Sequence, residues 1–212
     1  MAPESERPLR LMIYDRTCRG RRFLPGLSHA WASGAVLYRA LGRLDATRGV
    51  ESWDEALAWL ADYEPERRIA EIQYWGHGRW GSPRVSGQIL ETEMLLRAHP
   101  RRAALERVAS RMLEDDRGLF WFRTCETFGA HAGLEFARVF ADTIRCRAAG
   151  HTYIIGHWQS GLHSVLPGRT PDWSPDEGLL EGTPDDPKRA AWSKARAPNT
   201  ISFLHGRIPE GY

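Results

Sequence analysis

A histidine and a cysteine in this chain have the residue types and the spacing of a nucleophile and its proton carrier. His77 lies between Gly76 and Gly78, and Cys125 follows it by 48 residues. A cysteine nucleophile needs an imidazole nearby to take and return its proton. The flanking glycines allow a substrate backbone to come close, and a free N–H there could stabilise an oxyanion. The pair therefore indicates acyl-transfer chemistry.

Each of the two residues follows an apolar run that predicts a buried strand. Ile69–Trp75 ends two residues before His77, and residues 119–123 end two residues before Cys125. Residues 9–14, 153–155 and 162–166 predict further strands. In an open α/β sheet ligands bind at the carboxyl ends of the strands, where both candidates fall.

Helical segments separate these strands. Residues 53–63 follow Ser52, a good N-cap with Glu55 at the capping-box spacing. Three further helices are predicted at 28–41, 101–114 and 133–148, and a hairpin within 79–90. The alternation of strands and helices predicts an α/β fold, a three-layer α/β/α sandwich with a mainly parallel sheet.

Two short runs carry a resemblance to a known family. IQYWGHG resembles the strand ending in His-Gly of caspase-like peptidases, and LFWFRTCETFG resembles their cysteine-bearing strand. The helix that follows and the run HTYIIGHW are similar to their next helix and strand. The resemblance is strongest to bacterial caspase- and gingipain-like domains and spans about residues 9–166.

The resemblance implies a caspase–hemoglobinase-like fold and a cysteine endopeptidase. Cys125 would be the nucleophile. His77 would polarise the region of the scissile carbonyl and protonate the leaving amine. The N–H groups of Gly78 and Cys125 would form the oxyanion hole. The chain departs from the family at Thr124, Glu126 and Gly76. A carboxylate at Glu126 would also raise the thiol pKa.

A substrate cleft is expected around these two residues. By strand alternation, Trp75 lies on the same face as His77. The arginines after the first strand would favour an acidic substrate residue, and the acids of the C-terminal segment would favour a basic one. Both signs are present, so the preference stays open between acidic and basic residues. The cleft candidates are Arg16, Trp75, Trp80, Glu126, His157, Trp158 and Asp172.

No metal site or cofactor is predicted. His151, His157 and His163 recur every six residues but lack the convergent ligand spacing of a zinc site. Cys146 is expected in a helix and Cys18 in a loop, both in non-catalytic roles. No phosphate-loop, zincin or lipase-elbow signature occurs.

The amino-acid composition limits which other classes of function the chain could have. Twenty-nine basic and 27 acidic residues leave a net charge of +2, which disfavours a nucleic-acid partner. Three cysteines and no long apolar run favour a cytoplasmic protein with no membrane contact. Residues 1–8 are expected to be disordered, 9–166 to form the α/β domain, and 167–212 to be a Pro-rich acidic extension packed on it.

Three functions follow from these observations. The first is a caspase-like cysteine peptidase acting on a protein or peptide substrate. The second is a catalytically inactive caspase-like module in a bacterial signalling or defence complex. The third is an arginine-rich α/β protein that binds a phosphorylated ligand or nucleic acid through the loop after the first strand.

Overall fold

The computed structural model describes residues 7–21, 24–96 and 99–210, and within them it shows a six-stranded sheet covered on both faces. The strand order is β11-β9-β8-β5-β1-β4. All neighbouring pairs are parallel except β11, which runs antiparallel to β9. This is the predicted three-layer α/β/α sandwich.

The sheet consists of five parallel strands and one antiparallel edge strand. The two strands that carry the candidate residues, β5 and β8, are the two central ones and pair directly. The strands are β1 (Leu9–Asp15), β4 (Ala46–Val50), β5 (Ile69–Trp75), β8 (Asp115–Arg123), β9 (Cys146–His151) and β11 (Leu162–Val165).

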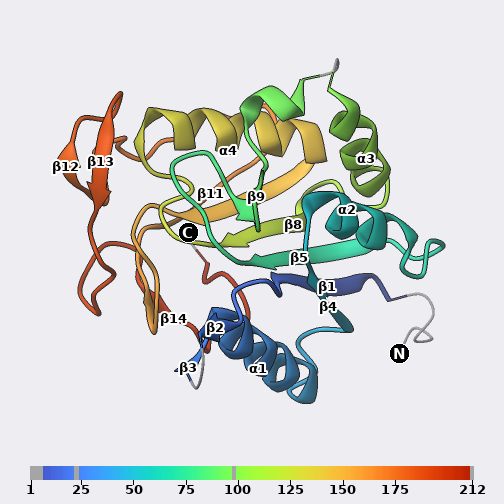
Figure 1. The fold of residues 1–212 in the computed structure, drawn as a ribbon. Coiled ribbons are helices and arrows are strands. Elements are labelled where there is room, and N and C mark those ends of the chain that lie inside the picture. Colours follow the sequence, from blue (N-terminus) through green and yellow to red (C-terminus); the bar gives the residue numbers. More distant parts are fainter. Residues whose placement is uncertain (1–6, 22–23, 97–98, 211–212) are drawn as a thin grey trace.

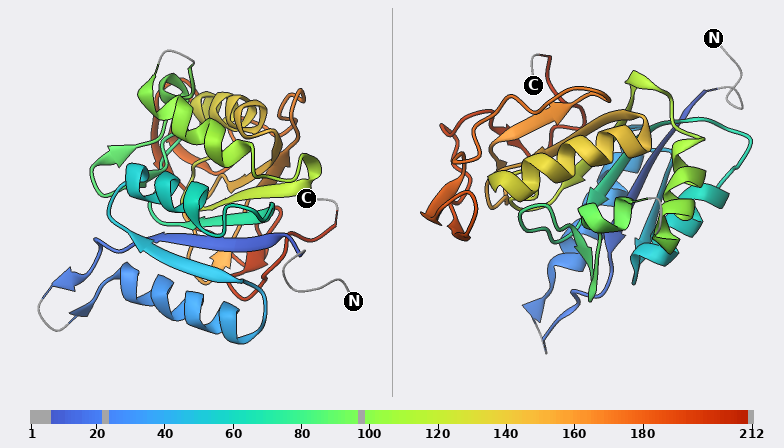
Figure 2. Two further views of the ribbon diagram at one scale, coloured as in Figure 1. Left: turned by 90° about the vertical axis from the view of Figure 1, so that its right-hand side faces the viewer. Right: turned by 90° about the horizontal axis from the view of Figure 1, so that it is seen from above.

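The helices divide between the two faces of the sheet (Figure 2). One face packs against α2, α3 and α4 around a large core that includes the Phe120, Phe122 and Phe140 rings. The other face is covered by α1 and by the C-terminal segment. The helices are α1 (Leu27–Ala40), α2 (Trp53–Asp62), α3 (Pro100–Ala109) and α4 (Ala130–Ile144), with a 3-10 turn at Thr92–Leu95.

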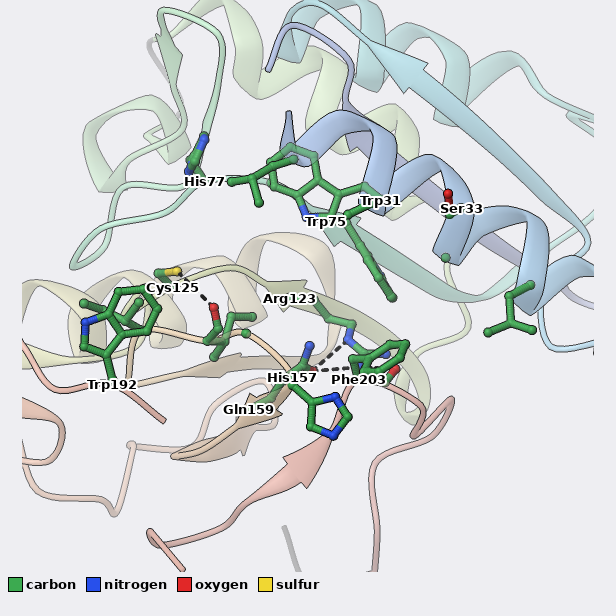
Figure 3. Close-up of a pocket in the computed structure, with 18 residues that line it drawn as sticks. Trp31, Ser33, Trp75, His77, Arg123, Cys125, His157, Gln159, Trp192 and Phe203 are labelled. Atoms are coloured by element: carbon green, nitrogen blue, oxygen red, sulfur yellow. Dashed lines mark hydrogen bonds between the residues drawn. The ribbon is translucent and has the colours of Figure 1, made fainter. Parts of the chain in front are cut away.

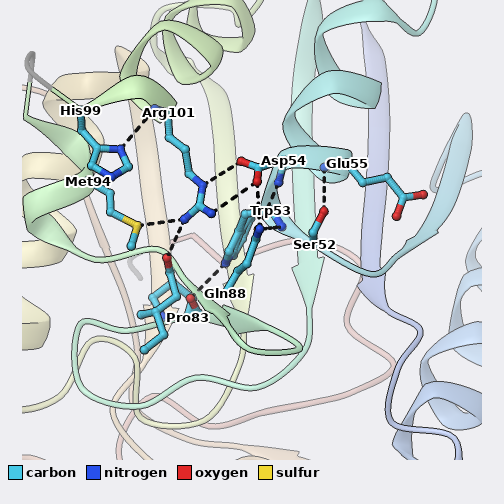
Figure 4. Close-up of polar contacts among 10 residues, drawn as sticks. Ser52, Trp53, Asp54, Glu55, Pro83, Gln88, Met94, His99 and Arg101 are labelled. Carbon is cyan, nitrogen blue, oxygen red and sulfur yellow. Dashed lines mark hydrogen bonds and ion pairs between the residues drawn. The ribbon is translucent and has the colours of Figure 1, made fainter.

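The N-terminus of α2 forms as its sequence predicts. Ser52 Oγ accepts a hydrogen bond from the Glu55 amide at 3.0 Å, and Gln88 Oε1 accepts one from the Trp53 amide at 2.8 Å (Figure 4). Arg101 at the start of α3 donates to Asp54 at 2.7 Å. These bonds satisfy free amides of the first turn and join α2 to α3 and to the predicted hairpin, β6 (Arg84–Val85) with β7 (Gln88–Ile89).

The prediction for residues 133–155 is wrong in its second half. α4 ends at Ile144, Arg145 takes a left-handed conformation with φ 59°, and the next strand begins at Cys146. Cys146 therefore lies in a strand and not in a helix, and residues 153–155 form no strand. The alanines of this stretch favour a helix locally, but pairing between β8 and β11 in the sheet overrides that propensity.

The other differences are smaller. α3 ends at Ala109 rather than at residue 114, because Met112 bridges to Ile69 of β5. Sequence reasoning missed β4, a polar edge strand, and the short pair β2 (Gly20–Arg21) with β3 (Leu24–Pro25). The expected disorder falls largely on residues 1–6, outside the described residues.

The C-terminal extension is more regular than its proline content suggests. β12 (Leu179–Gly182) and β13 (Pro187–Ala190) form a hairpin, and β14 (Ile201–Ser202) pairs with β10 (Trp158–Gln159). Trp173 stacks on Phe128, with centroids 5.7 Å apart, and fixes the extension against the sheet. No described helix is long and apolar enough to cross a membrane.

Strand β9 needs a small residue at Gly150. A Cβ atom there would lie 2.6 Å from Cδ1 of the buried Phe128 ring. We therefore expect Gly150→Ala to destabilise the protein by about 1–3 kcal/mol, the usual cost of overpacking a core.

Urea unfolding of Gly150→Ala and of a control, Gly87→Ala, measures this cost. Gly87 lies in the turn between β6 and β7 with no heavy atom within 4 Å of its Cβ position. An unchanged stability in Gly150→Ala would contradict the packing described for β9.

Candidate active site

A cavity of about 720 Å³ opens at the carboxyl ends of β5 and β8 (Figure 3). It lies between helix α1, the loop that follows β9, and the C-terminal segment. Both His77 and Cys125 line it. Its other described lining residues are Leu27, Ala30, Trp31, Ser33, Gly34, Leu37, Trp75, Gly76, Arg123, Ile154, Ile155, Gly156, His157, Gln159, Trp192 and Phe203.

His77 is held by its backbone and by one aromatic neighbour. Its carbonyl accepts a hydrogen bond from the Arg84 amide at 2.9 Å, which ties it to the β6–β7 hairpin. Its ring meets the Trp31 ring edge-on, with centroids 5.6 Å apart. Gly76 permits this turn, since a Cβ there would lie 2.0 Å from the Tyr74 hydroxyl.

The Cys125 thiol is protonated in the resting site. Burial is the main cause that raises its pKa to about 11, and the neighbouring Glu126 raises it further. The Sγ atom lies 3.9 Å from the Ile155 carbonyl oxygen, to which the thiol donates. Within the described residues, no hydrogen bond joins Sγ to the His77 ring.

The segment after His77 touches the segment around Cys125. A Cβ atom on Gly78 would lie 2.0 Å from Thr127 Oγ1 and 2.9 Å from the Cys125 carbonyl oxygen. A Thr124–Thr127 hydroxyl pair at 2.6 Å closes the turn that carries Cys125. Among the described residues no hydrogen bond donated by the Gly78 or the Cys125 amide is found, and of these two residues only Cys125 lines the cavity.

Glu126 lies beside Cys125 with a left-handed backbone and a buried carboxyl oxygen. Its φ is 35°, and the buried Oε2 atom has no partner among the described residues. Burial raises the pKa of its carboxyl to about 7, against the opposing effect of Arg79 and Arg84. The expected effect of Glu126 on the thiol pKa is confirmed in direction.

Of the remaining cleft candidates, the structure brings Trp75 and His157 to the cavity and leaves four outside it. Arg16 forms an exposed ion pair with Glu51, and Arg19 bonds the same carboxylate. Trp80 packs under Arg79 at 4.7 Å beside a separate hollow. Trp158 and Asp172 are exposed and do not line the cavity, although the Trp158 ring meets the His157 ring with centroids 5.0 Å apart.

Arg123 is a cavity residue that sequence reasoning missed. It is fully buried, and all five of its N–H groups are used. Nε and Nη2 donate to Gln159 Oε1 at 3.1 and 2.7 Å, Nη1 to the Tyr38 hydroxyl and the His205 carbonyl, and Nη2 to the Phe203 carbonyl. The one feature of the sequence that could have indicated its place in the cavity is its position two residues before Cys125.

Trp31, Trp192 and Phe203 were also missed. They come from α1 and from two points of the C-terminal extension, far from the candidate motifs in sequence. The abundance of tryptophan, nine in the chain, was the one signal that pointed toward an aromatic cleft. Trp121, which alternation places on the same face as Cys125, is buried beneath the cavity and does not line it.

The histidines spaced six residues apart do not converge. His151 is buried with Nδ1 bonded to the Ser160 carbonyl, and burial lowers its pKa to about 3. His163 pairs with Glu177 at 2.8 Å, while His157 lines the cavity. The described residues contain no group of three or more side chains placed to hold a metal ion.

The state of Glu126 predicts a pH-dependent reactivity of Cys125. Below about pH 7 the Glu126 carboxyl holds a proton, and above it the carboxylate opposes the thiolate. We expect Glu126→Gln to speed iodoacetamide alkylation of Cys125 severalfold at pH 8–9 and to change it little at pH 6.

Mass spectrometry of the Cys125 peptide across this pH range gives the rates, with Glu135→Gln, an exposed change on α4, as the control. Equal rates for the wild type and Glu126→Gln at pH 9 would show that the carboxylate does not act on the thiol.

The chain was compared with protein families, with curated proteins and with solved structures. No family model, no curated protein and no solved structure matches it. The function proposed below therefore rests on the chemistry of the cavity and on the two sequence motifs that carry His77 and Cys125.

Proposed function

We propose that the protein is a caspase-like cysteine peptidase in which Cys125 attacks a peptide bond and His77 carries the proton. One observation carries this proposal: His77 and Cys125 follow the two central strands and line one cavity. The fold order of strand, His-Gly, helix, strand and Cys is also the order of the family that the two motifs resemble.

The reaction uses only groups of this site. The Cys125 thiol gives its proton to the His77 imidazole, and the thiolate attacks the carbonyl carbon of the substrate. The Gly78 and Cys125 amides donate to the oxyanion of the tetrahedral intermediate. The C–N bond then breaks, the imidazolium protonates the leaving amine, and water hydrolyses the thioester to release the acid and restore the thiol.

Because the thiol is protonated in the free protein, we propose that Cys125 is activated only when the substrate binds. With a thiol pKa of about 11, the free enzyme at neutral pH contains little thiolate. A substrate that covers the cavity excludes water and brings its carbonyl to the free amides, which stabilise charge only as it develops. We propose a protein or peptide as the substrate and, from the three unpaired cysteines, a reducing cytoplasmic compartment.

The same thiol favours a second candidate function. A cysteine that is protonated and not bonded to His77 also fits a catalytically inactive caspase-like module that binds a partner in this cavity. Its cavity would bind peptide without cleaving it. The loop after β1 gives less support to the phosphate-binding alternative, because Arg16 and Arg19 both contact Glu51.

A peptide carrying an electrophilic thiol-reactive group tests the reaction. We expect labelling of the wild type at Cys125, none in Cys125→Ala, and labelling slowed by about 10²–10⁴-fold in His77→Ala, the usual range for lost acid–base catalysis. Peptide hydrolysis is expected to fall in parallel.

Two controls separate the site from general effects. Cys18→Ser removes another partly exposed thiol, and His131→Gln removes an exposed histidine that pairs with Asp185. Both are expected to label as the wild type does. Labelling that persists in Cys125→Ala assigns the nucleophile elsewhere, and peptide binding without turnover favours the inactive module.

A further inference from the structure

The cavity beside Cys125 is apolar over most of its lining. Trp31 and Trp75 form the side next to α1, Ile155 borders the thiol, and Trp192 with Phe203 forms the opposite side (Figure 3). Its volume of about 720 Å³ is ample for one large side chain. The class of substrate therefore depends on whether any charge in the lining is free to bind.

Arg123 is not free to bind an acidic group. Its five N–H groups are all donated to protein acceptors, and its faces lie over Trp75 at 4.6 Å and Trp121 at 4.4 Å. A substrate carboxylate would have to break these bonds to gain a bidentate contact. The one arginine in the lining therefore gives no site for aspartate or glutamate.

A basic side chain finds no partner either. No aspartate or glutamate occurs among the described residues that line the cavity. The carboxyl of Glu126, although next to Cys125 in sequence, does not line it. Burying a lysine or arginine there would leave its charge unpaired, which is costly.

Apolar surface at the cavity is left in water instead. Trp192 is 66% exposed and Leu27 is 50% exposed. The Trp75 indole packs closely against α1, since a Cβ on Gly34 would be 2.9 Å from its Cζ3 atom, and Gln73 Oε1 accepts a hydrogen bond from its Nε1 at 2.9 Å. A large apolar side chain would cover these surfaces and pack against fixed indole rings.

We propose that this cavity binds a bulky apolar side chain, preferably aromatic, on the residue whose carbonyl Cys125 attacks. This specificity rests on the proposed peptidase reaction. It differs from the acidic and basic preferences that the two charge clusters of the sequence left open.

Binding and cleavage are measured separately. Acetyl-Ala-Ala-X-amide peptides, with X as Phe, Asp or Arg, are titrated into Cys125→Ala by calorimetry, and the matching aminomethylcoumarin substrates are given to the wild type. We expect the Phe peptide to bind, and its substrate to be cleaved, at least about tenfold better than either charged peptide.

Two pairs of variants locate the effect. Ala30→Phe fills the cavity from an exposed position of α1, and Val36→Phe adds the same ring to α1 outside the cavity. Trp192→Ala removes a lining indole, and Leu180→Ala removes an exposed apolar side chain of β12 that does not line the cavity. The first member of each pair is expected to lose about tenfold in kcat/KM for the Phe substrate, and the second to keep it.

The outcomes are distinguishable. Cleavage that favours Asp or Arg overturns the apolar preference while supporting the reaction. Binding of the Phe peptide to Cys125→Ala, with no cleavage of any peptide by the wild type, supports the preference of the cavity and overturns the peptidase. Equal losses in both members of each pair overturn the assignment to this cavity.

Discussion

The buried guanidinium of Arg123 joins the elements that form the cavity. It forms no ion pair with a carboxylate of the described residues, and burial lowers its pKa. Five hydrogen bonds to neutral acceptors replace the water that it loses, and these acceptors belong to α1, β10 and the C-terminal segment. A buried charge with one partner removed is strongly destabilising, so the arrangement is kept as a unit. The elements around the cavity are thereby fixed to the end of β8, two residues before Cys125.

The same burial that orders the cavity sets the chemistry of Cys125. A thiol pKa of about 11 leaves on the order of one thiolate in ten thousand molecules at neutral pH. The resting site is thus a neutral thiol and not a preformed ion pair, and Glu126, with a pKa of about 7, makes it more so as pH rises. In the proposed peptidase reaction, the thiol would therefore attack a peptide bond only after the bound substrate supplies the remaining alignment.

Sequence reasoning succeeded where local pattern and packing agree. The strand Ile69–Trp75 matched at both ends, and the Ser52 cap formed as its spacing predicted. The shared position of His77 and Cys125 followed from placing them after two central strands. The strand Cys146–His151 was missed because its small residues favour a helix until Phe128 packs onto Gly150. Arg123 could not be assigned because all its partners are distant in sequence.

Charge counted along the sequence was a poor guide to the site because the charged clusters are neutralised where they lie. Glu51 contacts Arg16 and Arg19 at the surface. In the extension, Asp186 pairs with Lys188 and Asp185 with His131, all exposed to water that weakens their reach. The cavity instead gathers single aromatic residues from distant segments, which no local composition reveals. The proposed specificity therefore rests on the tertiary convergence of Trp31, Trp75 and Trp192 around the Cys125 thiol.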